Sequence, residues 1–448
     1  MTAFSESRRQ ALHMSMAAFA LLLRFLTWWQ AAACAAAAFI FNLVALPRLG
    51  RSTLFRAEDA ARGYPLGILF YPLSVLVLIV AFPRRPDIVA AAWGIMAFGD
   101  GAATLVGMRV KSAPIPWNRR KTAAGSTAFV VAGATAGAAL AWWTRPSVSP
   151  APPMAFTLGA PALAALAAAG VESMRVRLDD NISVPIAAAI VLGGLGLIDA
   201  ASWEAARAAL PPMLAYAALV NVPAAALGWR AGAVTPAGAI VGALIGIAVF
   251  AGAGPAGWAL LVLSFLAAAI STRIGLERKS VLGIAESRGG RRGPGNAVAN
   301  TGLAAFAALV AVLSAHRAGA LLVMVTALVA GASDTVASEI GKAWGTRTYL
   351  FPAFTRVRPG TSGAVSLEGT GAGLVAALAM AALASWLGLV SGSALWIVPV
   401  AATAGAFVES SLGATLETSG VLDNDMLNFI NTSVSAAFAV ALAWVVAR

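Results

Sequence analysis

The chain has 448 residues, 60% of them hydrophobic and 11% charged, and carries a formal net charge of +12 at pH 7. The apolar residues fall in blocks of about 17–22, the length that crosses a hydrocarbon core as a helix, which excludes a water-soluble globular protein. The basic residues are scattered over the short segments between the blocks and form no dense basic face, which argues against a nucleic-acid-binding protein.

The pattern predicts an all-α, polytopic integral membrane protein with about 14–15 transmembrane helices. The first block begins near Ala11 and should be retained, because the apolar run resumes through Trp28 without a small-residue cleavage site. We expect helices near residues 11–27, 29–47, 64–82, 86–108, 122–143, 153–170, 182–203, 208–228, 234–251, 256–273, 297–315, 319–342, 362–390, 393–413 and 426–447.

The distribution of Lys and Arg predicts the orientation in the membrane. With the N-terminus inside, seven of the 31 basic residues fall on the outer side, which leaves 24 for the cytoplasmic side, as the positive-inside rule requires. The seven are Arg24, Arg84, Arg85, Arg145, Arg207, Arg317 and Arg448. Few basic residues are Lys, and Ala and Gly are abundant, which indicates a bacterium with GC-rich DNA. We therefore expect a multi-pass protein of the bacterial inner membrane.

Polar groups interrupt the apolar helices in two clusters, and an ionisable residue at membrane depth marks a site or a pathway. Both clusters contain, in the same order, an Asp, a Gly seven residues later, a basic residue, a turn of Gly, Ser or Thr, a Glu-Ser pair and an Asp-Asn pair. The first comprises Asp100, Gly107, Lys121, Gly125-Ser126-Thr127, Glu172-Ser173 and Asp180-Asn181. The second comprises Asp334, Gly341, Arg358, Thr361-Ser362-Gly363, Glu409-Ser410 and Asp423-Asn424.

The spacing within the clusters also agrees, with 72 residues from Asp to Glu in the first and 75 in the second. Small residues that only let helices pack closely would explain the glycines but not the matched carboxylates. The sequence therefore predicts two fused halves, residues 1–230 and 231–448, with one site each. Because an even number of expected helices separates matching elements, the halves should form a parallel repeat with both sites facing the cytoplasm.

The side chains of both clusters suit the transfer of a phosphoryl or nucleotidyl group. Carboxylates and Asp-Asn pairs offer hard oxygen ligands of the kind that Mg²⁺ takes. A Gly-Ser or Thr-Ser-Gly turn that opens a helix presents free backbone N–H groups to a phosphate, and Arg and Lys complete an anion clamp. Neither half has a Walker loop or a protein-kinase signature, so membrane helices must build the nucleotide site. So many apolar helices imply a lipid-like acceptor, an isoprenoid or another lipid alcohol.

Residues 1 to about 190 resemble the phytol and dolichol kinase family of CTP-dependent membrane lipid kinases. The matching residues are Glu6-Ser-Arg-Arg-Gln-Ala-Leu-His13, Tyr64-Pro65-Leu66, Phe98-Gly99-Asp100-Gly101, Pro116-Trp117-Asn118, Lys121-Thr122, Gly125-Ser126, Glu172, Asp179-Asp180-Asn181 and Pro185. Ala124 departs from the family, in which an acidic residue often precedes the Gly-Ser, so a role for that acid does not carry over.

Residues from about 234 to the end resemble a second membrane family, that of phytyl-phosphate kinase and transmembrane protein 19. The matching residues are Thr235-Pro236, Gly238, Lys279, Arg288-Gly289, Arg291-Arg292-Gly293, Ala299-Asn300, Ser333-Asp334-Thr335, Ser338-Glu339, Gly341, Gly360-Thr361-Ser362-Gly363, Ser366, Glu409-Ser410 and Gly413-Ala414. A Gln that often precedes the Ala-Asn of relatives is not evident here, and Asn296 is the nearest amide.

The two resemblances imply a bifunctional isoprenoid kinase of prenyl diphosphate salvage. The first half would convert a prenyl alcohol of the phytol, farnesol or geranylgeraniol type into its monophosphate with CTP. The second half would convert that monophosphate into the diphosphate. The implied cofactors are Mg²⁺ and CTP or another nucleoside triphosphate, and the implied partners are the prenyl alcohol, its monophosphate and the lipid bilayer, without nucleic acid.

The resemblances also imply roles for individual residues. The catalytic residues would be His13, Asp100, Glu172, Asp334 and Glu409. The metal ligands would be Asp100, Glu172, Asp180, Asn181, Asp334, Glu339, Glu409, Asp423 and Asn424. The nucleotide and phosphate contacts would be Trp117, Asn118, Lys121, Gly125, Ser126, Lys279, Arg288, Arg291, Arg292, Asn300, Arg358, Thr361 and Ser362.

Two other classes of protein fit parts of the pattern. A lipid cytidylyltransferase of the CDP-diacylglycerol synthase type would also use CTP in the membrane, but its His-Gly-Gly-x-x-Asp-Arg-x-Asp run is not present here. A secondary transporter with parallel repeats would also carry carboxylates near the middle of the membrane. Consumption of CTP that depends on a prenol distinguishes a kinase from a transporter.

Overall fold

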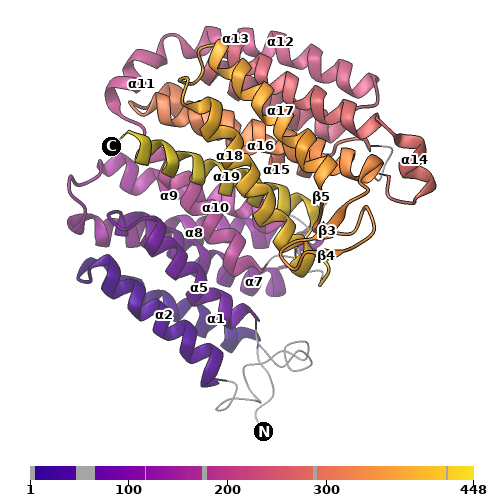
Figure 1. Ribbon diagram of the computed structural model, residues 1–448. Helices are drawn as coiled ribbons and strands as arrows, with labels where there is room; N and C mark the ends of the chain where they lie inside the picture. The colour runs from indigo at the N-terminus through magenta and orange to yellow at the C-terminus, as the bar shows by residue number, and fades with distance from the viewer. Residues whose placement is uncertain are drawn as a thin grey trace. The chain divides into compact units, whose positions relative to one another are not determined.

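The computed structural model describes residues 6–46, 66–116, 118–173, 179–285, 290–419 and 422–447, and helices dominate them (Figure 1). The prediction of an all-α, polytopic membrane protein is confirmed. The chain divides into two compact units, Met1–Gly196 and Leu197–Arg448. Helices α11 (Ala200–Arg207) and α12 (Leu210–Arg230) lie in the second unit, whereas the predicted functional halves meet at residue 230.

The first unit begins with helices before its small sheet and continues with three long helices after it. Its elements are α1 (Glu6–Ser15), the 3₁₀ helix η1 (Met16–Arg24), α2 (Trp28–Val44), α5 (Leu66–Ala81), α6 (Pro86–Gly94), the π-helical turn η2 (Ile95–Gly99), α7 (Asp100–Arg109), β1 (Pro114–Ile115), β2 (Asn118–Thr122), α8 (Ala123–Thr144), the 3₁₀ turn η3 (Arg145–Ser147), α9 (Met154–Ser173) and α10 (Asp180–Leu195).

The second unit follows a comparable order. After α11 and α12 come α13 (Pro236–Arg273), α14 (Leu276–Val281), α15 (Pro294–Leu313), α16 (Arg317–Trp344), β3 (Thr348–Leu350), β4 (Thr355–Arg356), β5 (Ala364–Ser366), α17 (Leu367–Trp386), α18 (Ala394–Leu412), the π-helical turn η5 (Gly413–Glu417) and α19 (Asn424–Val446).

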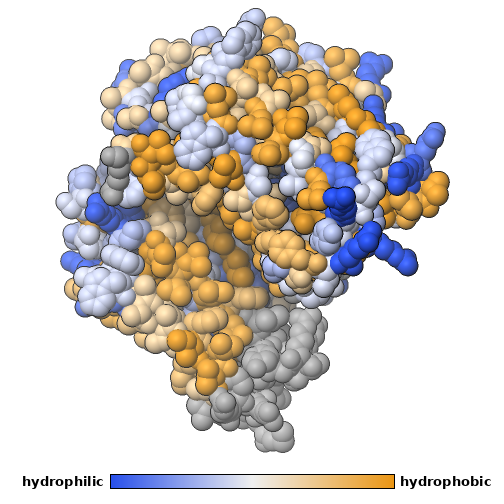
Figure 2. Space-filling view, viewed as in Figure 1, coloured by the Kyte–Doolittle hydropathy of each residue, from blue (hydrophilic) through white to orange (hydrophobic). Residues whose placement is uncertain are grey.

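Each unit has its own hydrophobic core, rich in Ala and other small apolar residues. In the first unit α6 is buried throughout. Its neighbour α8 approaches closely, since a Cβ at Gly94 would lie 3.1 Å from the backbone of Ala136. On the outside, large apolar side chains such as Trp142 and Leu219 are more than half exposed, as lipid-facing residues are, and Figure 2 shows wide apolar areas on one face.

Ten helices within the described ranges are long and apolar enough to cross a membrane, or eleven if the bent pair α10 and α11 counts as one span. By this measure the prediction of 14–15 spans is too high, for three reasons. The N-terminal block forms the short α1 and a 3₁₀ helix, and α2 and α5 are shorter apolar helices. The measure also counts α13 once, although this element contains both spans expected at 234–251 and 256–273.

Helix α13 nevertheless reverses its direction, because the backbone at Gly254 is not helical, with φ 67° and ψ −165°. A straight helix of 38 residues would be about 57 Å long. Both ends of α13 instead reach one short segment: the N–H of Thr235 donates to the carbonyl of Arg292, and a Cβ at Gly290 would lie 2.9 Å from the Thr272 side chain. The element is a helical hairpin whose turn has a positive φ that favours glycine, so its two arms correspond to the two expected spans.

Two small antiparallel sheets, which the sequence pattern did not predict, follow the helices that carry the key aspartates. In the first unit β1 pairs with β2, and in the second β3 lies between β4 and β5. Each sheet leads directly into a helix. The Thr122 side chain accepts a hydrogen bond from the N–H of Gly125 at the start of α8, and Ser366 accepts one from Gly369 at the start of α17. The sheets thus fix where these helices begin.

The close approach of α13 and α15 gives a first prediction. A Cβ at Gly252 would overlap the carbonyl oxygen of Ala308 in α15, so the helices must separate to accept it. We expect Gly252→Ala to lower the free energy of unfolding by about 1–3 kcal/mol. Thermal unfolding in detergent measures the effect, with Gly371→Ala as the control, because a Cβ at Gly371 meets nothing within 4 Å. Equal midpoints for the two variants would contradict the packing described.

Candidate functional site

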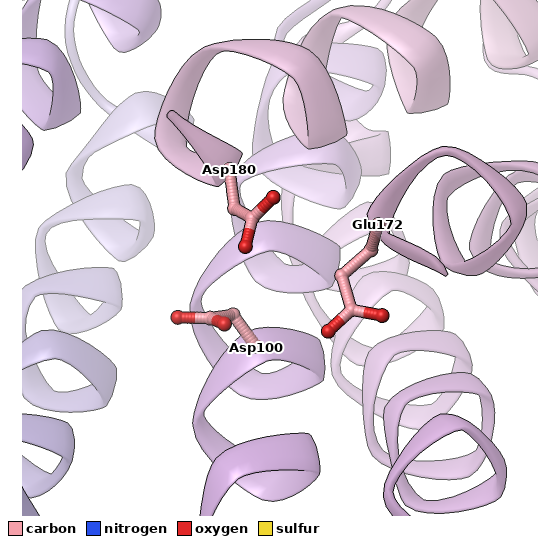
Figure 3. A group of neighbouring side chains, drawn as sticks. All are labelled: Asp100, Glu172 and Asp180. Atoms are coloured by element: carbon pink, nitrogen blue, oxygen red, sulfur yellow. The ribbon is translucent and has the colours of Figure 1, made fainter. Parts of the chain in front are cut away.

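Three carboxylates from three helices meet in the first unit. Asp100 begins α7 directly after the π-helical turn η2, Glu172 lies at the end of α9, and Asp180 begins α10. One oxygen of each lies within 4.8 Å of the others, and Figure 3 shows the three side chains directed toward a common space. Among the described residues this is the only such group of three. The structure thus brings together three of the predicted metal ligands.

Lys121 of β2 reaches the same space. Its Nζ lies 2.5 Å from Oε1 of Glu172 and 3.4 Å from Oδ2 of Asp180. Burial acts to lower the pKa of Lys121, but the charges of Asp180 and Glu172 outweigh it and raise the pKa above its ordinary value, so the ammonium is charged at neutral pH. With all three acids ionised, the group keeps two negative charges, which suits a divalent cation. Oε2 of Glu172 is buried without a hydrogen-bond partner and is open to such a ligand.

His13 faces this group from α1. Its Nε2 lies 3.9 Å from Oδ2 of Asp100 and is buried without a hydrogen-bond partner. Two aromatic residues hold His13: the Tyr71 hydroxyl donates to the His13 carbonyl at 3.2 Å, and Trp93 Nε1 donates to the Tyr71 oxygen at 2.8 Å. Tyr71 and Trp93 were not predicted, although a Tyr inside an otherwise apolar block was a usable signal.

The start of α8 lies beside the carboxylates, where the sequence predicts phosphate contacts. Gly125 fits closely there, since a Cβ would lie 3.1 Å from both the Ala103 carbonyl and the Thr122 hydroxyl. The Ser126 hydroxyl is buried without a partner, and the first turn of a helix attracts anions. Asn118 is buried in β2 and accepts from the N–H of Arg120, and Trp117 lies outside the described residues.

The Asn181 side chain makes structural hydrogen bonds within the protein. Its side-chain nitrogen donates to the carbonyl of Gly67 and to Asp179, which ties the start of α10 to the start of α5. Asp179, which was not predicted as a site residue, caps α10 and so orients the neighbouring Asp180. A role of Asn181 as a metal ligand stays a prediction.

In the second unit a cavity of about 900 Å³ collects most of the predicted residues, a size typical of small-molecule sites. We call it the polar cavity. Predicted residues on its wall are Arg291, Arg292, Asp334, Glu339, Thr361, Ser362, Glu409, Asp423 and Asn424. Lys279, Asn300 and Arg358 are not part of this wall, and Arg288 lies outside the described residues.

Lys279 and Glu339 pair inside the protein. Lys279 is fully buried, and its Nζ lies 2.5 Å from Glu339 Oε2 and donates to the carbonyls of Ser271 and Thr272. Lys342 lies 2.8 Å from the other Glu339 oxygen. An ammonium has three donors, so Lys279 has none left for a phosphate, and both Glu339 oxygens face ammonium groups rather than an open ligand position. Both side chains are thus engaged with the protein in this structure, and the predicted roles of Lys279 and Glu339 stay predictions.

The polar cavity is also lined by Asp334, Glu409, Glu417, Asp423 and Asp425. Glu409 has a buried oxygen without a hydrogen-bond partner, and Asp423 caps α19. The Ser362 hydroxyl donates a hydrogen bond to Glu417. Glu417 was not among the predicted site residues, although it follows Glu409 by only eight residues. Asp425 was missed as well, although it adjoins the predicted Asp-Asn pair. Unlike the first unit, the described part of the second holds no group of three crowded carboxylates.

The glycine at the start of α17 has surroundings similar to those of Gly125 at the start of α8. A Cβ at Gly369 would meet the carbonyl of Ala337 and the hydroxyl of Ser366, which repeats the surroundings of Gly125. The surroundings of Gly369 thus match those of Gly125, whereas the order of residues in the sequence pointed to the turn at Thr361. The local arrangement of helix, sheet and helix recurs in both units.

Parts of the chain resemble known membrane proteins. Residues 219–436 match integral membrane protein DUF92. An uncharacterised membrane protein of Synechocystis sp. is 37% identical over 202 residues, which are 44% of this chain and 78% of that protein. Protein VTE6, chloroplastic, of Arabidopsis thaliana is 34% identical over 209 residues, which are 44% of this chain and 62% of that protein.

A further relative has a named activity. Phytol kinase 1, chloroplastic, of Arabidopsis thaliana is 35% identical over 134 residues, which are 30% of this chain and 43% of that protein. The chain thus spans less than two thirds of the length of both Arabidopsis proteins. No solved structure matches the chain.

The buried pair of Lys279 and Glu339 gives a second prediction. We expect Lys279→Met to lower the free energy of unfolding by about 3–5 kcal/mol, because it leaves a buried acid with one partner fewer. Lys342→Met should cost less, since that side chain is 24% exposed and water can replace it. Chemical or thermal unfolding in detergent measures both. In the double variant Lys279→Met/Glu339→Gln, the loss of unfolding free energy should be smaller than the sum of the losses in the two single variants. A loss equal to that sum would mean that the pair is not coupled.

Proposed function

This chain belongs to the integral membrane protein family DUF92, and we propose that it is a membrane kinase for prenyl substrates. Its relatives include a protein named phytol kinase, and the first unit carries the ordered series of residues that resembles that family. The observation that carries the proposal is the group of Asp100, Glu172 and Asp180 with Lys121 among them. Oxygen ligands and a fixed cation at one point are what phosphoryl transfer requires.

In the first unit the proposed reaction uses a prenyl alcohol and CTP. The hydroxyl oxygen forms a bond to the γ-phosphorus of CTP, the bond to the bridging oxygen breaks, and CDP leaves. His13 is placed to accept the hydroxyl proton, because its Nε2 is buried without a partner next to Asp100. Asp100, Glu172 and Asp180 would hold Mg²⁺, which when bound neutralises charge on the triphosphate. Lys121 and the start of α8 would hold phosphate oxygens.

The second unit would use the prenyl monophosphate as its acceptor and produce the diphosphate. Arg291 and Arg292 border the polar cavity, and such cations suit an acceptor that already carries phosphate. Asp334 and Glu409 on the same wall would take the place of the first unit's acids. The matching surroundings of Gly125 and Gly369 support the proposal that the two halves are a repeat. Both sites would face the cytoplasm of a bacterial cell.

A product assay with aspartate variants tests the two-step proposal. With farnesol and CTP, the purified chain in detergent should form farnesyl monophosphate and then the diphosphate. Asp100→Asn should slow monophosphate formation by at least about 10²-fold and leave the second step intact when monophosphate is supplied. Asp334→Asn should make the monophosphate accumulate.

The control for both variants is Glu204→Gln, which makes the same chemical change in a half-exposed surface ion pair with Arg207. Loss of both steps in either aspartate variant would contradict two independent sites. Release of pyrophosphate with a CDP-lipid product would indicate a cytidylyltransferase instead. Nucleotide turnover that never depends on a prenol or its phosphate would reject the kinase proposal.

Removal of divalent cations provides a separate prediction. Chelation with EDTA should abolish both steps, and added Mg²⁺ should restore them, because in the first unit two negative charges otherwise remain uncompensated beside the triphosphate. The rate of product formation measures this, with chelator already saturated by Mg²⁺ as the control. Unchanged activity in excess EDTA would reject the proposed metal site.

A further inference from the structure

A second cavity of about 180 Å³ lies among α12, α13, α15 and α16 of the second unit. Its wall is mostly apolar, and we call it the apolar groove. Residues that line it include Gly228, Gly242, Ile245, Leu261 and Phe265. Three residues, Arg292, Gly293 and Asn296, border both the apolar groove and the polar cavity. The two spaces therefore adjoin, with a guanidinium at their junction.

The buried amides along the apolar groove are engaged with the protein. Asn221 accepts a hydrogen bond from Trp258 Nε1 at 2.9 Å and donates to the carbonyl of Ala217. The side-chain nitrogen of Asn300 donates to the carbonyl of Asn296. The Asn300 oxygen is buried without a hydrogen-bond partner, but the other amide groups named here are used internally and most of the wall is apolar, so the groove favours hydrocarbon over a polar ligand.

The rim of the apolar groove lies at the lipid-facing surface. On the groove wall itself, Ala224 of α12 is exposed, and Gly228 of α12 and Ala239 and Gly242 of α13 are partly exposed. Apolar side chains exposed to this extent on membrane helices contact lipid tails. A hydrocarbon chain can therefore continue from the groove into the bilayer without meeting water.

We propose that the apolar groove binds the part of a lipid monophosphate's hydrocarbon tail that adjoins its phosphate, while the phosphate lies in the polar cavity beside Arg292. The inference rests on the proposed function, of which it defines the second substrate. A cavity of about 150 Å³ holds a group the size of benzene, so the apolar groove encloses little more than one isoprene unit. The rest of the tail lies in the membrane. The second site therefore selects the chemistry next to the phosphate and is tolerant of chain length.

A substitution that fills the groove tests this inference. A Cβ at Gly242 meets nothing within 4 Å, so a larger side chain there enters the groove without a backbone clash. We expect Gly242→Phe to raise the KM for farnesyl monophosphate at least about tenfold, from the lost burial of several carbons, with little change in kcat. Farnesyl and geranylgeranyl monophosphates should have similar KM values in the unaltered protein.

The matched control is Gly371→Phe, because Gly371 is also a helical glycine with open space around it and lies outside both cavity walls. Gly242→Leu replaces the Phe variant if the latter does not fold. Unchanged KM in a folded Gly242 variant, or a steep dependence on chain length from C15 to C20, would overturn the inference.

Direct labelling separates a failure of the inference from a failure of the proposed function. Farnesyl monophosphate with a photoreactive group in its first isoprene unit is bound without nucleotide and cross-linked, and the labelled peptides are identified by mass spectrometry. Label in α12 and in the first arm of α13, reduced by Gly242→Phe, supports the groove even if no phosphoryl transfer is detected. Normal turnover with label only elsewhere overturns the groove and leaves the kinase proposal standing.

Discussion

Charge buried among apolar helices is the constraint on which the rest of the structure depends. In the first unit three carboxylates lie within 4.8 Å of one another, where like charges repel strongly unless cations compensate them. Lys121 supplies one compensating charge, and it is placed by β2. The short sheet before α8 therefore matters to the site as much as the helices that carry the acids.

The second unit meets the same constraint in another way. Glu339 is neutralised by Lys279 and Lys342, and this clamp joins α14 to α16 and to the end of α13. The segment that follows α14 along the chain includes Arg292, which borders both the polar cavity and the apolar groove. A fully buried ion pair thus holds α14, which precedes Arg292 along the chain, while Asp334 and Glu409 line the polar cavity.

Small residues make these arrangements possible, because they let backbones approach where larger side chains would keep helices apart. Gly99 lies against the Phe129 ring, and Gly125 lies against the backbone of α7. The start of α8 consequently lies close to the helix that Asp100 begins. The proposed chemistry depends on this closeness, because phosphoryl transfer is catalysed mainly by positioning and by neutralisation of charge.

The sequence alone determined the class of protein, because blocks of apolar residues of spanning length leave no soluble alternative. It also singled out Asp100, Glu172 and Asp180, since ionisable residues stand out in apolar helices. Which groups pair was decided only by the tertiary structure. The partner of Lys279 is 60 residues away, and the surroundings of Gly125 are matched by those of Gly369, because both depend on which helices become neighbours. Hydropathy along a chain records how deeply a segment is buried but not which segment it packs against, so the contact of Tyr71 with His13 followed only from the folded chain.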